Sequence, residues 1–179
     1  EHRLNCLARA EQSDETGRRT LNQLFGILNH LEILRPDWKP FVQNAQSILK
    51  KHLPCTQEQD QKFRTVFTDR VIEQLMVYFV FTYFCGAVYN ENAYGKMKFA
   101  FAGTILIREL CRAQWLESIQ NGKDDADSAR DPEKYFPIFL RTAWRYAREI
   151  EHSDQNKYRM EEMLGDEERF GLENLFSLL

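Results

Sequence analysis

A short acidic segment near the C-terminal end of the chain carries the residue types best suited to chemistry. Glu149, Glu151, His152 and Asp154 place three carboxylates and an imidazole within six residues. Glu149 and His152 form a Glu-x-x-His pair, which is the spacing at which helices of di-iron bundles supply two ligands. Such a site needs a second pair on another helix, and none of the other three histidines has a glutamate three residues before it. The sequence therefore predicts no metal site.

A basic stripe lies on the same expected helix. At 100° per residue, residues 138–152 place apolar side chains on one arc and basic side chains on the opposite, outer arc, with Glu149 beside them. One interpretation is a solvated face in which Arg145 and Glu149 form an ordinary i,i+4 pair. The other is a surface that binds an acidic partner or an anionic cofactor group. The stripe consists of Arg141, Arg145, Arg148 and His152.

The elements that must position this segment are all expected to be helical. Helical periodicity predicts an all-α fold, a single domain over residues 1–179 of about seven helices, with a possible small subdomain at 1–54. Two helices, 3–11 and 14–34, are expected near the N-terminus. Two long aromatic-rich helices, 57–89 and 93–120, are expected to form a central antiparallel pair. The apolar part of the first, 75–89, is shorter than the roughly 20 residues of a membrane span, so a buried core helix is expected.

Composition and cysteines restrict the class further. The net charge of −3 leaves no basic excess for neutralising phosphates, which argues against nucleic acid as a partner. Cys6, Cys55, Cys85 and Cys111 are widely spaced and form no Cys-x-x-Cys pair, so neither a local zinc or cluster site nor a disulfide framework is expected. Cys85 and Cys111 lie in apolar runs and are expected to be buried. This pattern fits a reducing cytoplasm.

Several segments together resemble one family. They are Tyr-Ala-Arg-Glu-Ile-Glu-His-Ser-Asp-Gln-Asn at 146–156, the aromatic run at 74–90 with Lys-Met-Lys-Phe-Ala at 96–100, and the ending at 170–179. In this order, from about residue 73 onward, they resemble the C-terminal part of the flagellin lysine N-methylase family. The resemblance implies flagellin as partner and S-adenosylmethionine as methyl donor. It also implies a cysteine-rich N-terminal region, absent from this chain, that holds an iron–sulfur cluster.

The resemblance gives the candidate residues a possible role. Methylation of a lysine needs a neutral amine, so a site must remove a proton and orient the nitrogen. The catalytic candidates are Glu149, Glu151, His152 and Asp154. The substrate-binding candidates are Arg141, Arg145, Arg148, Tyr78, Tyr83 and Tyr89. For the tyrosines, ordinary core packing with the hydroxyl at the surface is the alternative.

The sequence thus favours the C-terminal domain of a protein-lysine N-methyltransferase in the bacterial cytoplasm, inactive when isolated. We expect it to recognise flagellin, to contact its own N-terminal cysteine-rich region and to bind no membrane. One alternative is a non-catalytic helical interaction module. Another is a small-molecule-binding bundle with a deep aromatic pocket near residues 78–89.

Overall fold

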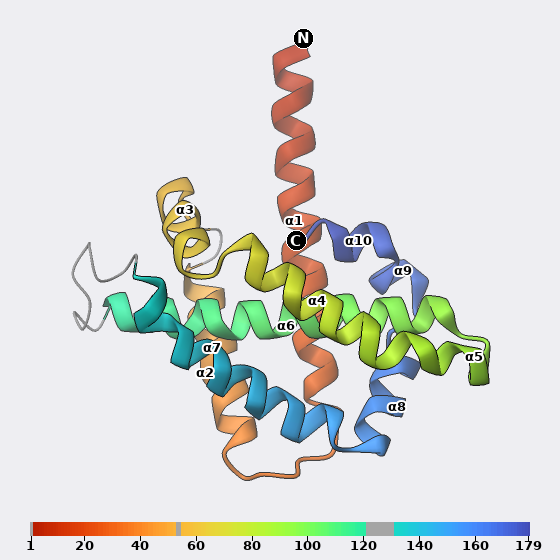
Figure 1. Cartoon of the computed structure of the whole chain (residues 1–179). Coiled ribbons are helices and arrows are strands. Elements are labelled where there is room, and N and C mark those ends of the chain that lie inside the picture. The colour runs from red at the N-terminus through yellow and green to blue at the C-terminus, as the bar shows by residue number, and fades with distance from the viewer. Residues whose placement is uncertain (1, 53–54, 121–130) are drawn as a thin grey trace.

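The computed structural model describes residues 2–52, 55–120 and 131–179, and within these the side chains of all but residues 2–14 and 90. The protein is 84% helical, and no strand occurs in the described ranges, which confirms the all-α prediction. Figure 1 shows the arrangement of the elements. In chain order they are α1 (His2–Leu28), α2 (Trp38–His52), α3 (Gln57–Val66), α4 (Asp69–Tyr83), the 3₁₀ turn η1 (Phe84–Gly86), α5 (Ala87–Asn90), α6 (Ala93–Gln120), α7 (Pro132–Tyr146), the π-helical segment η3 (Ala147–Glu151), α8 (Asp154–Met163), α9 (Glu167–Phe170) and α10 (Leu172–Phe176).

Two expected helix boundaries are wrong. The separate helices at 3–11 and 14–34 are one helix, α1, which ends at Leu28, because polar residues inside a helix weaken it without stopping it. The expected helix at 57–89 breaks at Phe67, whose backbone leaves the helical region. The Phe67 ring stacks on Phe63 at 5.6 Å and meets the edge of Phe139 on α7 at 5.3 Å, so tertiary packing overrides local helix propensity there.

Helix α6 is the centre of the molecule. Every residue from 98 to 113 is buried, and α2, α4 and α7 all pack against this helix (Figure 1). A left-handed residue, Glu91 with φ of 56°, returns the chain from α5 into α6. Helices α4 and α6 approach closely at Gly103, where an added Cβ would lie 2.8 Å from Cζ of Phe79. This contact fixes the position of α4.

Helix α4, in contrast, is not the buried helix expected from its composition. Only Leu75 and Phe79 among its residues are buried, while Val77 and Phe81 face solvent. By length and composition alone, the stretch Asp69–Tyr89 is long and apolar enough to cross a membrane. In this fold the same stretch packs on α6 through Leu75 and Phe79, with its other side outward.

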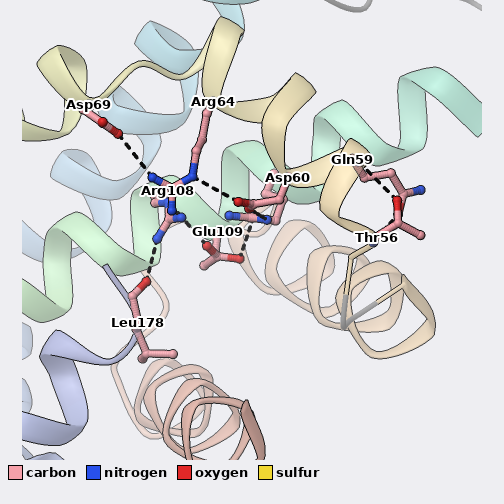
Figure 2. A network of polar contacts seen from close by, with 9 residues as sticks. Thr56, Gln59, Asp60, Arg64, Asp69, Arg108, Glu109 and Leu178 are labelled. Atoms are coloured by element: carbon pink, nitrogen blue, oxygen red, sulfur yellow. Dashed lines mark hydrogen bonds and ion pairs between the residues drawn. The ribbon is translucent and has the colours of Figure 1, made fainter. Parts of the chain in front are cut away.

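A polar network connects α3 to α6, and we call it the arginine network (Figure 2). Arg112 pairs with Asp60 at 2.9 Å and with Glu109 at 3.2 Å, and Arg64 pairs with Asp60 at 3.0 Å. Arg108 lies 3.8 Å from Glu109 and donates to the Leu178 carbonyl at 2.5 Å. The network therefore also ties down the last residues of the chain.

Candidate functional site

The segment that carries the acidic residues folds as a π-helix. In η3 the His152 N–H donates to the carbonyl of Ala147, five residues earlier, at 3.0 Å. A π turn holds more residues per turn than an α-helix, so the side chains after Tyr146 rotate away from the positions expected at 100° each. The helical projection is therefore wrong for Glu149, although Ile150 is buried and His152 is exposed, as a regular helix also predicts.

Glu149 shows the consequence. It was expected on the outer face beside the arginines, and it is instead fully buried. Its Oε1 accepts from the backbone N–H of Leu34 at 2.6 Å and of Arg35 at 3.4 Å. The expected pair between Arg145 and Glu149 does not form among the ion pairs of the described residues. Glu149 therefore holds the segment between α1 and α2 in place.

Asn156 reinforces this anchor, although no sequence pattern predicted a role for it. Its side chain accepts from Glu32 N at 2.8 Å and donates to the carbonyls of Glu32 at 2.9 Å and Glu149 at 2.8 Å. Its backbone N–H is capped by Ser153. The available signal in the sequence was an asparagine three residues after the N-cap Ser153. Its backbone partner at Glu32 lies 124 residues away in the sequence, so this signal could not reveal the contact.

The basic stripe is largely used within the protein. Arg145 lies 3.8 Å from Asp37 and stacks on Phe41, and Arg148 lies 3.5 Å from Asp37 and stacks on Trp144. Arg141 is exposed, and so is His152 at the end of η3. Of the three arginines named as substrate-binding candidates, two thus hold the α1–α2 connection against α7, and Arg141 lies open to solvent.

Glu151 is the candidate that the fold places with two of the predicted tyrosines. Its Oε2 accepts from the hydroxyl of Tyr83 at 2.7 Å and from that of Tyr78 at 2.9 Å. The tyrosines come from α4 and the carboxylate from η3, so the contact joins elements about 70 residues apart. We call Tyr78, Tyr83 and Glu151 the tyrosine–carboxylate cluster.

Burial and the carboxylate keep these phenols protonated. Burial first, and then the hydrogen bond to Glu151, raise the pKa of Tyr83 far above its ordinary value and that of Tyr78 in the same direction. Burial also raises the pKa of Tyr146, which is fully buried beneath the cluster, and the charge of Glu151 raises it further. The tyrosines are therefore donors, and Glu151 is the acceptor.

Charge balance distinguishes Glu151 from Glu161 and Glu167. Glu161 pairs with Lys96 on α6, and Glu167 pairs with Lys98 at 2.7 Å. Within the described part of the chain, no lysine or arginine forms an ion pair with Glu151. The cluster thus combines a half-exposed carboxylate with two phenol donors and lacks a cation among these residues.

The remaining candidates lie apart from this cluster. The Asp154 side chain is solvent-exposed and bonds Lys157 at 2.8 Å, and this hydrogen bond lowers the pKa of Asp154. Tyr89 is almost wholly exposed, and no hydrogen bond joins it to the cluster in the described region. Because Glu149 is buried and His152 exposed, the Glu-x-x-His pair does not converge on one metal.

The described residues provide no ligand set for a metal or cluster. They contain no group of three or more His, Cys, Asp or Glu side chains placed to hold a metal ion. Cys55, Cys85 and Cys111 are free thiols. Cys111 is buried as expected, and burial raises its pKa to about 12, but Cys85 is exposed, because its side of the chain faces away from α6.

Two cavities lined by described residues lie away from the cluster. One of about 160 Å³ lies between α1 and α2, with Leu21, Phe25 and Leu49 in its lining. Another lies between α1 and the α8–α9 region, and His30, Met163 and Phe170 line part of it. Neither contains Tyr78, Tyr83 or Glu151, so these cavities give no support to a deep aromatic pocket near residues 78–89.

The fold and the site define an all-α domain with a tyrosine–carboxylate cluster anchored on a π-helix. A family model described as the FliB lysine N-methylase C-terminal domain matches residues 8–178. The chain therefore belongs to this family, in agreement with the resemblance seen in its sequence. No curated protein and no solved structure matches it.

Proposed function

We propose that this chain is the C-terminal domain of a protein-lysine N-methyltransferase that methylates flagellin, and that it contributes substrate recognition and part of the active site. The supporting observation is the tyrosine–carboxylate cluster, where Glu151 accepts from Tyr78 and Tyr83 and has no cation among the described residues. A lysine ammonium has the charge and the three donors that such a carboxylate accepts.

The cluster can serve the step that lysine methylation requires. A lysine amine is protonated at neutral pH, with an ordinary pKa of about 10.4, and its nitrogen has no free lone pair in that state. Glu151 would bind the ammonium and take up its proton, while Tyr78 and Tyr83 orient the carboxylate. S-adenosylmethionine is the proposed source of the methyl group.

We assign cofactor binding to another part of the protein, as the family resemblance implies. In this proposal an iron–sulfur cluster is held by a cysteine-rich N-terminal region that contacts this domain. We further propose that the isolated domain is inactive and that the whole enzyme works in the cytoplasm.

Substitution of Glu151 tests the proposal. In the full-length protein, Glu151→Gln keeps the size of the side chain and removes its charge. Methyl transfer to unmethylated flagellin from S-adenosylmethionine is expected to fall by about 10²- to 10⁴-fold in kcat, which is the usual contribution of a general base. Glu173→Gln, the same change at an exposed glutamate on α10, is the matched control and should leave kcat unchanged.

Calorimetric titration with flagellin monomer separates the two main interpretations. Loss of turnover with unchanged flagellin binding supports a catalytic role for Glu151. Loss of binding alone would instead favour a non-catalytic interaction module, which the exposed apolar side of α4 also suggests. Full turnover by the Glu151→Gln variant would refute the proposed role.

A further inference from the structure

An apolar surface runs along the solvent side of α4, η1 and α5. Phe81 and Val88 are each 81% exposed and Tyr89 is 92% exposed, which is unusual for side chains of this size. We call this surface the α4 apolar face. It consists of Val77, Phe81, Phe84, Val88 and Tyr89.

The geometry of this face is that of a helix-binding strip. Its first four members run through α4, the 3₁₀ turn η1 and α5 at spacings of four, three and four residues, which are the spacings of side chains on one side of a helical stretch. From Val77 to Val88 the strip is about 16 Å long at a helical rise of 1.5 Å per residue. A groove-bound or face-bound helix uses anchors at the same spacing over a similar length.

Packing on the opposite side of α4 fixes the α4 apolar face in an outward orientation. Leu75 and Phe79 are buried on the opposite side of α4, and Gly103 lets Phe79 sit against the α6 backbone. Among the described residues nothing covers the face. A contiguous apolar surface on a fixed helix marks an interaction site.

Charge indicates which partner fits. Between residues 69 and 91 the exposed charged side chains are Asp69, Glu73, Glu91 and Arg70. Asp69 lies 3.6 Å from Arg64, and the two lysines that follow, Lys96 and Lys98, are paired with Glu161 and Glu167. Glu73 and Glu91 against Arg70 leave a small excess of negative charge beside the face.

The exposed apolar residues of α7 have mixed surroundings. Phe136, Leu140 and Trp144 are also exposed, with the acids Asp131 and Glu133 at the start of the helix and Arg141 beside them. The α4 apolar face differs in its position, because Tyr78 joins it to Glu151.

We propose that the α4 apolar face docks a lysine-bearing amphipathic helix of the substrate protein. This inference rests on the proposed function and narrows its substrate class. The apolar side of the bound helix packs on Phe81 and Val88, and its lysines lie near the acids that flank the face. Tyr78 forms the edge shared by this docking surface and the tyrosine–carboxylate cluster.

Two other occupants fit less well. In a symmetric pairing with a second copy, the acids around the face would meet their own equivalents and repel. An anionic membrane surface would be repelled by the same acids, since such surfaces attract basic segments. Both occupants are tested together with the proposed one.

The experiment titrates the protein with a synthetic peptide of about 18 residues, long enough to cover the strip as a helix. The peptide carries leucines at i, i+3, i+4 and i+7 and lysines elsewhere. A scrambled peptide of the same composition and a peptide with glutamate in place of lysine serve as probes of pattern and charge. The variants are Phe81→Asp and Val88→Asp, both fully accessible positions, and the matched control is Tyr158→Asp, at a 73% exposed aromatic on α8.

The leucine–lysine peptide is expected to bind, and the other two peptides to bind at least about tenfold more weakly. Phe81→Asp and Val88→Asp should each weaken binding about tenfold, as loss of a central anchor does, and Tyr158→Asp should not. Equal binding of all three peptides, or binding insensitive to Phe81→Asp, overturns the proposal. If the peptides do not bind, but the protein binds vesicles and Phe81→Asp abolishes this, the face binds lipid and the proposal is overturned. If the peptides do not bind, but the protein dimerises and Phe81→Asp abolishes this, the face binds a second copy and the proposal is also overturned.

The readouts keep this inference separate from the proposed function. If the peptide does not bind, but methylation still depends on Glu151, only the docking site is refuted. If the peptide binds, but the Glu151→Gln variant methylates flagellin fully, only the catalytic role is refuted.

Discussion

The arginine network and the tyrosine–carboxylate cluster both join distant parts of the chain through carboxylates, but they balance charge in opposite ways. In the network, Arg112 has two carboxylate partners, and Glu109 lies between two arginines (Figure 2). In the cluster, Glu151 receives only neutral phenol donors from the described residues. The network pairs its arginines with carboxylates of the protein, although the buried Nε atoms of Arg108 and Arg112 form no hydrogen bond. The cluster, in our proposal, receives a cation from outside.

Burial follows the same division. Arg108, Glu109 and Arg112 are buried, while Glu151 and Tyr83 are half-buried and Tyr78 is exposed. Burial lowers the pKa of Arg108, but in Arg112 the charges of Glu109 and Asp60 outweigh burial and raise the pKa. A closed set of charges contributes to stability, and an open one is available for binding. Substitutions at Arg112, in the network, and at Glu151, in the cluster, test this contrast, and a substitution at the buried Glu149 is expected to lie between them in its effect on stability.

Arg112→Met should have the largest effect. It leaves Glu109 buried without its closest partner, and breaking a buried pair in this way costs about 3–5 kcal/mol of unfolding free energy. Urea denaturation of both proteins measures the loss. Arg64→Met, at a half-exposed arginine that pairs with the same Asp60, should cost less than about 1 kcal/mol. Equal losses for the two variants would contradict the distinction between buried and exposed members.

Arg112→Met should also change how the free energy of unfolding depends on pH in the acidic range. Burial favours the neutral form of Asp60, but its bonds to Arg112 and Arg64 outweigh this and lower its pKa. The stabilisation is therefore present above the ordinary carboxylate pKa and is lost as the pH falls through the lowered value. Arg112→Met should flatten this dependence.

Glu149→Ala should have an intermediate effect. It removes the buried carboxylate that accepts from the backbone N–H groups of Leu34 and Arg35, at a cost of about 1.5–3 kcal/mol, the usual contribution of hydrogen bonds to a charged group. Glu149→Gln keeps an oxygen acceptor and should lose less. Hydrogen exchange at Leu34 and Arg35 provides the site-specific readout. If both variants exchange like the unmodified protein, the anchoring role is wrong.

Glu151→Gln should have the smallest effect, below about 1 kcal/mol at neutral pH, because a partly exposed polar contact is replaced by another. Its signature lies at high pH. Since the pKa of Tyr83 is raised by burial and by Glu151, the stabilisation from its neutral phenol is present below its ordinary pKa near 10 and is lost as the pH rises above it. Loss of the Glu151 charge should lessen that alkaline decline in thermal melts. An unchanged decline would show that Glu151 does not act on Tyr83.

Part of this architecture could be predicted from the sequence. The all-α class followed from periodicity, and the helix expected to start at residue 57 does start there, where Thr56 and Gln59 form a capping box. Tyr78, Tyr83 and Glu151 were named as candidates because of a family resemblance, and the fold brings them together. Nothing in local spacing predicted that contact, since it depends on how α4 and η3 pack.

The wrong expectations share a cause. Glu149 was placed outside because a regular helix was assumed through a π turn, and α4 was placed inside because apolar content was taken to mean burial. Backbone irregularities and partner surfaces are both invisible to a periodic pattern. The helix break at Phe67 is a third example, since the rings that hold it belong to α3 and α7.

The π turn at Ala147–Glu151 also makes this stretch of chain sensitive to its length. Removing a single residue would restore a regular α-helix, and Glu149 and Glu151 would then shift register relative to Tyr146. One carboxylate would leave the Leu34 amide and the other would leave the two phenols. Insertions and deletions within these five residues should therefore be far less tolerated than side-chain replacements.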